Sequence, residues 1–175
     1  MPSAIKILAI SGSLRKVSTN TTLLQAARVI LPADVEISLY DGLDSLPHFN
    51  PDLEDSAPAS VIEFRDRIKA ADGILICSPE YAHGVPGVLK NALDWIVGSG
   101  ELVDKPVALW NASPRATLAQ ASLAETIRVM SAKLVSQADI PLMGVKLDAA
   151  ALAAHPELSG LIRSAIADFA AVIRR

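Results

Sequence analysis

The sequence predicts an α/β fold in which a five-stranded parallel sheet is covered by helices on both faces. Short apolar segments of strand length alternate with longer amphipathic segments along the chain. The first and third short segments are apolar over most of their length, as strands are when both faces of a sheet are buried. Strands that alternate with helices in this way are joined by right-handed crossovers and form a parallel sheet.

The first part of the chain supplies two strands and one helix. Residues 4–10 are a run of mainly Ile, Leu and Ala, which predicts a buried strand. Residues 22–31 place their apolar side chains on one helical face, and Pro32 ends this helix. Residues 35–40 alternate apolar and polar side chains, as an outer strand does. Residues 41–58 are expected to form a long irregular loop.

The rest of the chain continues the alternation. An amphipathic helix is expected over residues 60–71, and the apolar residues 73–77 form the third strand. A further helix starts near Pro86, because proline suits the first turn of a helix. The remaining elements are expected in the order strand, helix, strand and helix, at residues 107–110, 118–137, 142–147 and 157–173.

Five strands connected in this way favour the flavodoxin-like order 2-1-3-4-5, in a three-layer α/β sandwich. Ligands of such sheets bind beyond the carboxyl ends of the strands, near the switch point between strands one and three. The loops at residues 11–21 and 78–87 should therefore carry the chemistry. With 175 residues the chain is long enough for one sizeable core but short for two, so residues 1–175 are expected to form a single domain.

The composition excludes several functions. Sixteen Lys and Arg residues face 19 Asp and Glu residues, and the formal charge of -3 offers no basic field for nucleic acid. No segment reaches the apolar length of a membrane helix, so no membrane partner is expected. The one cysteine, Cys77, excludes an internal disulfide, favours a cytoplasmic location and is expected to be a small buried residue. The three histidines lack metal-ligand spacing, so no metal site is predicted.

Residues 11–22 read Ser-Gly-Ser-Leu-Arg-Lys-Val-Ser-Thr-Asn-Thr-Thr, between a buried strand and the start of a helix. Backbone N–H groups at a helix amino terminus, joined by hydroxyl donors, can hold a dianion without a large net charge on the protein. The loop therefore predicts a phosphate site. Asn20 or Thr21 could instead serve only as a helix cap. Capping alone would leave four polar residues without a role: Ser11, Ser13, Arg15 and Ser18.

Other loops that bind phosphate do not match these residues. A Walker A loop needs Gly-Lys-Ser or Gly-Lys-Thr after a spaced glycine, which is absent. A dinucleotide fingerprint needs three spaced glycines, yet no glycine follows Gly12 before Gly42. A small phosphatase on a similar fold would need a nucleophilic cysteine in this loop, whereas Cys77 lies at the end of the third strand.

Three ordered motifs identify a family. Residues 79–95 read Pro-Glu-Tyr-Ala-His-Gly-Val-Pro-Gly-Val-Leu-Lys-Asn-Ala-Leu-Asp-Trp, the most specific stretch in the chain. Residues 12–20 read Gly-Ser-Leu-Arg-Lys-Val-Ser-Thr-Asn, and residues 46–54 read Leu-Pro-His-Phe-Asn-Pro-Asp-Leu-Glu. In this order and context they resemble the motifs of the NADPH-dependent FMN reductase family, which includes quinone, chromate and azo reductases.

The resemblance implies an FMN at the predicted edge of the sheet. Its phosphate would be bound by Ser11, Ser13, Arg15, Ser18 and Asn20, with Thr21 as a further candidate. Its ring would lie against the backbone of Pro79, Glu80, Tyr81 and Ala82, near Gly84, with Ser113 on a third side. Arg15 could instead face the nicotinamide nucleotide. Ala82 stands where the family usually has Asn, and residues 111–117 lack the glycines common there, so ring contacts and substrate access are expected to differ.

The function implied by the resemblance is that of an FMN-dependent NAD(P)H oxidoreductase. NADPH or NADH would reduce the flavin by hydride transfer, and a quinone, azo compound, nitro compound or metal oxyanion such as chromate would be reduced in a second, ping-pong step. The flavin supplies this chemistry, so no catalytic side chain is predicted. The alternative is a flavodoxin-type electron carrier or a non-catalytic flavin-binding module. Resembling proteins also imply a homodimer or homotetramer in which residues 46–54 reach toward a neighbour's site.

Overall fold

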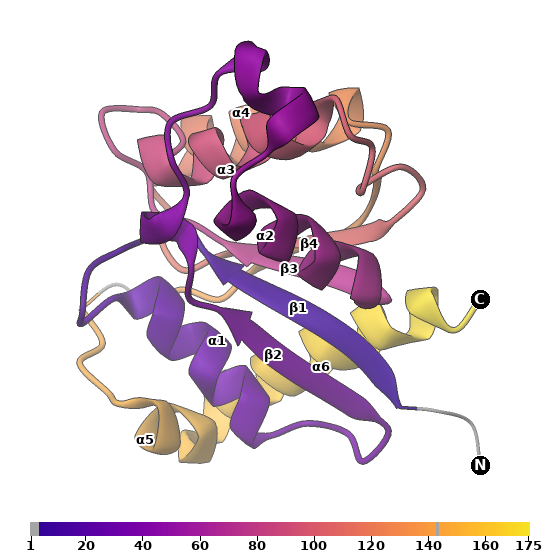
Figure 1. The fold of residues 1–175 in the computed structure, drawn as a ribbon. Coiled ribbons are helices and arrows are strands. Elements are labelled where there is room, and N and C mark those ends of the chain that lie inside the picture. Colours follow the sequence, from indigo (N-terminus) through magenta and orange to yellow (C-terminus); the bar gives the residue numbers. More distant parts are fainter. Residues whose placement is uncertain (1–3, 143) are drawn as a thin grey trace.

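The middle layer of the protein is an all-parallel sheet of five strands in the order β2-β1-β3-β4-β5 (Figure 1). The computed structural model describes residues 4–142 and 144–175. The strands are β1 (Ile5–Ser11), β2 (Val35–Tyr40), β3 (Gly73–Cys77), β4 (Pro106–Asn111) and β5 (Lys133–Asp139). The predicted fold class and strand order are both confirmed, and the first three strands lie within one residue of their predicted ranges.

Helices cover both faces of the sheet. One face carries α1 (Thr19–Val29), α5 (Ala149–Ala154) and α6 (Pro156–Ile173); in Figure 1, α1 and α5 lie at the lower left and α6 passes behind β2. The other carries α2 (Ala59–Ala70), α3 (Gly87–Val97) and α4 (Thr117–Val129). The segment predicted as an irregular loop contains two short 3-10 helices, η1 (Leu43–Ser45) and η2 (Pro51–Ser56). Within residues 4–142 and 144–175, no helix has the length and apolarity needed to cross a membrane.

Alternate residues of the central strands point into two separate cores. Ile7 and Ala9 of β1 pack with α1 and α6, whereas Leu8 and Ile10 pack with α2 and α3. Successive side chains of a strand point to opposite faces, and both faces are covered here, so nearly every position of β1 is apolar. Each fully buried Leu or Ile side chain contributes about 1.5–3 kcal/mol. The same pairing aligns the carboxyl ends of β1, β3 and β4, where the next loops begin.

The predicted end of the fourth helix is wrong. Residues 118–137 are predicted as one helix, but α4 ends at Val129 and β5 begins at Lys133. Ser131 between them has a φ of 59°, a left-handed conformation that cannot continue a right-handed helix. β5 lies at the edge of the sheet, where its side chains are partly exposed and include Lys133 and Asp139. Such a mixed segment lacks the continuous apolar run that marks the central strands.

The strand predicted at residues 142–147 is also wrong. Met143 lies outside the described residues, and the residues on either side of it form a loop between β5 and α5. The backbone N–H of Val145 donates to Leu142 O at 3.0 Å, which closes a turn there. The short helix α5 follows, capped by the Asp148 side chain through the backbone N–H of Ala151. The chain therefore provides a loop at the carboxyl edge of the sheet where a strand is predicted.

The segment 46–54 is held against α3 by two side chains. Asn91 Oδ1 accepts a hydrogen bond from the backbone N–H of Phe49 at 2.8 Å, and Asn91 Nδ2 donates to Pro47 O at 2.9 Å. Trp95 Nε1 also donates to Pro47 O, at 2.7 Å, and its ring meets Phe49 edge-on with centroids 5.2 Å apart. Asn91 and Trp95 thus join two of the three sequence motifs inside one chain.

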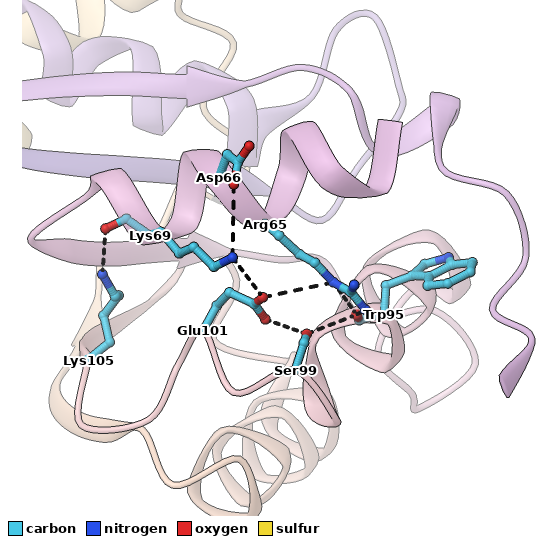
Figure 2. A network of polar contacts seen from close by, with 7 residues as sticks. All are labelled: Arg65, Asp66, Lys69, Trp95, Ser99, Glu101 and Lys105. Atoms are coloured by element: carbon cyan, nitrogen blue, oxygen red, sulfur yellow. Dashed lines mark hydrogen bonds and ion pairs between the residues drawn. The ribbon is translucent and has the colours of Figure 1, made fainter. Parts of the chain in front are cut away.

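Glu101, in the loop after α3, is the centre of a buried polar network (Figure 2). Its side chain is 1% exposed and faces Arg65 Nε at 3.9 Å and Lys69 Nζ at 3.7 Å, both from α2. Ser99 Oγ donates to Glu101 Oε2 at 2.5 Å. Arg65 also donates to the carbonyl oxygen of Trp95 in α3. The network therefore fixes α2 against the end of α3.

Candidate functional site

A cleft of about 1020 Å³ opens at the carboxyl edge of the sheet. It is lined by the β1–α1 loop and the first turns of α1, by Pro79 and Glu80 after β3, by the β4–α4 loop, and by the segment that follows β5. Open parallel sheets bind ligands at this edge, beside the point where the strand order reverses. That point lies between β1 and β3 here, so the cleft lies at the edge of the sheet that the sequence predicts.

Positive side chains outnumber negative ones around the cleft. Its cationic lining residues are Arg15, Lys16, Arg115 and Lys146. Its carboxylates are Glu80 and Asp148, and Asp148 also caps α5. A concave surface with this balance attracts anionic groups such as phosphates, although the whole chain has a net charge of -3.

The hydroxyl groups of the β1–α1 loop mainly build the start of α1. Ser18 is the N-cap, since its Oγ accepts from the backbone N–H of Thr21 at 3.4 Å. Ser11 Oγ and Thr21 Oγ1 are hydrogen-bonded to each other at 2.8 Å. The helix starts three residues before the predicted position, so Asn20 and Thr21 lie in its first turn and neither is the cap.

Two polar residues lie further along this loop toward solvent. Ser13 Oγ accepts a hydrogen bond from the backbone N–H of Arg15 at 3.3 Å, which shapes the turn. Arg15 is exposed and lines the cleft. Its guanidinium group is therefore accessible to an anion, as the phosphate interpretation requires.

Asn20 reaches the cleft from a buried position. It is 8% exposed and lines the cleft from the first turn of α1. Its Oδ1 accepts a hydrogen bond from Cys77 Sγ at 3.2 Å. Cys77 is fully buried at the end of β3, and burial raises the pKa of its thiol to about 12. The thiol is therefore protonated at neutral pH, in agreement with the expectation of a small buried residue.

Residues 81–84 form a tight turn after β3. The backbone N–H of Tyr81 donates to Gly84 O at 3.1 Å, and that of Gly84 donates to Tyr81 O at 2.9 Å. Ala82 and His83, at the centre of the turn, have φ values of 49° and 62°, as in a type I′ turn. Asn and Gly favour this conformation, so Ala82 departs from the residue types that the backbone prefers.

Glu80 connects the loop after β3 to the start of α4. Its Oε2 accepts a hydrogen bond from the backbone N–H of Ala119 at 2.9 Å, and its Oε1 meets His83 Nδ1 at 3.0 Å. Ala116, at the N-cap of α4, provides no capping side chain. The amide of Ala119, together with the weaker contribution of His83, lowers the pKa of Glu80. Glu80 is therefore ionised at neutral pH and caps α4 from another loop.

The β4–α4 loop forms a third wall of the cleft. Asn111 is buried at the end of β4, and its Oδ1 accepts a hydrogen bond from the backbone N–H of Ser113 at 3.0 Å. Ala112, Ser113 and Arg115 then line the cleft. This side-chain hydrogen bond holds the loop in place, although residues 111–117 contain no glycine.

The cleft brings together a subset of the residues chosen from the sequence. Those that line it are Arg15, Asn20, Pro79, Glu80 and Ser113. The others lie beside or behind its surface: Ser11, Ser13, Ser18, Thr21, Tyr81, Ala82 and Gly84. In the described part of the chain, no group of three or more His, Cys, Asp or Glu side chains could hold a metal ion.

One wall of the cleft was not predicted from the sequence. Residues 144–149 line it after β5, and Thr19, Thr22 and Gln25 line it from α1. The first group falls where a strand is predicted, so it is absent from the candidate residues. The segment after β5 contains Pro141 and Gly144, two residue types that indicate a loop in a sequence, and Gly144 has a φ of 81°.

Comparisons with known proteins agree with the fold and the motifs. The family model of the NADPH-dependent FMN reductases matches residues 5–142. The NAD(P)H-dependent FMN reductase of Pseudomonas aeruginosa is 41% identical over 116 residues, which cover 65% of this chain and 62% of that protein. The quinone reductase of Escherichia coli is 36% identical over 110 residues, which cover 62% of this chain and 57% of that protein. The matched regions thus span roughly half to three fifths of such relatives.

A solved structure extends the similarity over nearly the whole chain. The flavoenzyme NAD(P)H:(acceptor) oxidoreductase FerB of Paracoccus denitrificans is 29% identical, with a TM-score of 0.78 over 98% of both chains. The family description contains both FMN and NADPH, so the predicted oxidoreductase class and its cofactor pair are confirmed at the level of the family. The chain is a member of the NADPH-dependent FMN reductase family.

Proposed function

We propose that this chain is an FMN-dependent NAD(P)H oxidoreductase that passes electrons to small oxidised acceptors. The observation that carries the proposal is the basic cleft at the β1–β3 switch point, lined by the buried amide side chain of Asn20. Quinones are the first candidate acceptors, because several relatives are named quinone reductases. Azo compounds, nitro compounds and metal oxyanions such as chromate are further candidates.

The β1–α1 loop suits the phosphate group of FMN. Thr22 is the first residue of α1 whose backbone N–H has an intrahelical acceptor, Ser18 O at 2.8 Å. Ser18 Oγ accepts from the N–H of Thr21, so the N–H groups of Thr19 and Asn20 are the ones left for an anion. Asn20 and Arg15 add side-chain donors on the cleft surface. A Cβ atom at Gly12 would lie 2.3 Å from Ser78 Oγ, so glycine allows the loop to run this close to β3. We therefore assign the phosphate to this loop.

In this proposal, the other residues predicted in the β1–α1 loop affect FMN binding by shaping the turn. Ser18 caps α1, and Ser11 and Thr21 hold the two ends of the loop together. Ser13 orders the backbone at Arg15. Their replacement should weaken FMN binding indirectly, by loosening the turn that presents Asn20 and Arg15.

We assign the ring of the flavin to the side of Pro79, Glu80 and Ser113. These residues line the cleft from the loops after β3 and β4. The backbone N–H groups of Tyr81 and Gly84 are already paired within their turn, so those two residues contribute shape rather than donors. Ala82 lies in the same turn and has no side-chain polar group to offer the ring.

When bound, FMN supplies the chemistry of accepting a hydride from NADPH or NADH and delivering electrons to an acceptor. The residues of the chain bind and orient the molecules. Sites for small ligands usually enclose roughly 300–1000 Å³, and the cleft of about 1020 Å³ is just above that range. In this proposal donor and acceptor use one place beside the flavin in turn, which is a ping-pong order.

Anaerobic reduction tests the proposed function. The full chain is loaded with FMN, mixed with NADPH under nitrogen, and followed by the yellow absorbance of the flavin. We expect rapid bleaching, and recovery of the colour when a quinone is added. A yellow protein that NADPH does not bleach would instead indicate an electron carrier or a non-catalytic flavin-binding module. Steady-state rates with NADPH and NADH across quinone, azo, nitro and chromate acceptors then identify the preferred pair.

Matched variants connect this activity to the cleft. Arg15→Ala should raise the FMN dissociation constant by roughly 10- to 150-fold, since a charge-assisted hydrogen bond contributes about 1.5–3 kcal/mol. Arg163→Ala removes an exposed arginine from α6, away from the cleft, and should leave the dissociation constant unchanged. Equal effects of the two variants would contradict the assignment of the phosphate to the β1–α1 loop.

A homodimer or homotetramer, a single domain and a cytoplasmic location stay predictions. Exposed apolar side chains in the loops around the cleft support self-association: Leu14, Val17, Tyr81 and Leu147. The five strands join one sheet, which supports the single domain. Sedimentation velocity of the full chain would distinguish a monomer from a dimer or tetramer.

A further inference from the structure

The buried amide of Asn20 is held at one end only. Its Oδ1 accepts the hydrogen bond from Cys77 Sγ at 3.2 Å, and the residues that the structure describes provide no acceptor for Nδ2. Asn20 is 8% exposed and lines the cleft. Among the described residues, Trp110 Nε1 is the fully buried side-chain nitrogen or oxygen that lacks a partner, so Asn20 Nδ2 is reachable from the cleft and open to an acceptor there.

Cys77 determines which end of the amide is free. A protonated thiol can donate one hydrogen bond, and it can donate to Oδ1 but not to Nδ2. Complete burial favours the protonated form of Cys77. The S–H group is therefore available to donate to Asn20. This arrangement fixes the amide with its NH₂ group toward the cleft.

We propose that Cys77 is a positioning residue for the flavin phosphate: its thiol holds the Asn20 side chain so that Nδ2 donates to a phosphate oxygen in the cleft. The inference rests on the proposed function, because it needs FMN in this cleft. It assigns the one cysteine of the chain a role in recognising the phosphate rather than in electron transfer. Neither the position of Cys77 at a strand end nor its burial alone would reveal that role.

Flavin affinities of Cys77 variants test this role. Dissociation constants for FMN and for riboflavin, which lacks the phosphate, are measured by quenching of flavin fluorescence on the full chain. In Cys77→Ala the FMN constant should rise about tenfold, the upper end expected for one hydrogen bond, while the riboflavin constant changes less than about twofold. Cys77→Ser keeps a donor and should restore FMN binding to within about threefold of the unaltered chain.

Two controls separate positioning from a general loss of packing. Ile76→Val shortens the neighbouring residue of β3, which faces the other core, and should change neither flavin constant. In an Asn20→Ala background, Cys77→Ala should have no further effect on FMN binding, because the residue that it positions is gone. Cys77→Val serves as a second apolar variant if Cys77→Ala does not fold.

Three results would overturn the inference while leaving the proposed function intact. The first is unchanged FMN affinity in the apolar Cys77 variants. The second is a parallel loss of FMN and riboflavin affinity, as a packing defect would give. The third is an undiminished effect of Cys77→Ala in the Asn20→Ala background. Absence of saturable FMN binding by the unaltered chain would instead overturn the proposed function, and the inference with it.

Discussion

Ala82 occupies a backbone conformation that suits Asn or Gly better than Ala. Its φ of 49° lies in the left-handed region, which costs an L-residue with a Cβ atom roughly 1–2 kcal/mol. Asn tolerates this region because its side chain can hydrogen-bond locally. Ala82→Asn should therefore raise the free energy of unfolding by about 0.5–1 kcal/mol, measured by equilibrium denaturation in urea. Ala57→Asn, at a φ of -54°, is the matched control and should bring no gain.

Glu80 should make the stability of the protein depend on pH. Its pKa is lower in the folded chain than in the unfolded chain, because it accepts the hydrogen bond from Ala119 and interacts with His83. The stability that its charge contributes is present at neutral pH and is lost as the pH falls through the lowered pKa. Glu80→Gln should accordingly have a lower midpoint of thermal unfolding than the unaltered chain at pH 7, and this difference should disappear in acid.

The control for Glu80 is Glu36, an exposed carboxylate on β2. Thermal unfolding of Glu36→Gln should match that of the unaltered chain across the same pH range. A difference between Glu80→Gln and the unaltered chain that persists unchanged in acid would contradict the role of the ionised carboxylate as a cap of α4.

The hydrogen bonds that hold residues 46–54 against α3 can be tested by replacing Asn91. Asn91→Ala removes the hydrogen bonds to Phe49 N and Pro47 O, and should lower the free energy of unfolding by about 2 kcal/mol. Hydrogen exchange should accelerate in residues 46–54 and not in β1. Lys90→Ala is the control, since the exposed Lys90–Asp94 pair on the same helix contributes under about 0.5 kcal/mol. Unchanged exchange in Asn91→Ala would show that other contacts hold the segment.

The buried network of Figure 2 should contribute far more to the free energy of unfolding than a surface ion pair does. Glu101→Ala leaves Arg65 without its buried carboxylate, and breaking a buried pair costs about 3–5 kcal/mol. Glu63→Ala removes the partner of Arg67 on the same helix α2, but Glu63 is 53% exposed and its loss should cost under about 1 kcal/mol. Denaturant unfolding measures the loss of stability in each variant. Equal losses in Glu101→Ala and Glu63→Ala would mean that the network does not secure α2.

The strands that the sequence predicts best are those with a clear apolar pattern, either a continuous run or a regular alternation. β1 and β3 are apolar because both of their faces are covered, so their ranges were predictable from composition alone. β5 was not, because it shows neither the continuous apolar run of β1 and β3 nor the regular alternation of apolar and polar residues that marks β2, the other edge strand. The left-handed Ser131, which separates α4 from β5, has no signature in the residue type. The short helix α5 gives too brief a pattern to detect by periodicity.

For the molecule as a whole, the edge of the sheet that holds the cleft was predictable, while the side chains that face it were not. Alternating strands and helices place the loops after β1 and β3 beside each other, whatever their detailed conformation. Whether a hydroxyl faces a ligand or a neighbour depends on three-dimensional contacts. Ser11 pairs with Thr21, and Ser18 caps α1, although all three look equally suited to a phosphate in the sequence.

A crystal structure of the full chain with FMN tests the central claim most directly. We predict the phosphate within hydrogen-bond distance of Asn20 Nδ2, at the start of α1, and the ring beside Pro79 and Glu80. A second cavity, of about 460 Å³, lies elsewhere on the sheet and is lined by Lys6, Arg28 and Arg67 among others. A flavin bound there, or one whose phosphate lies away from the β1–α1 loop, would contradict the account.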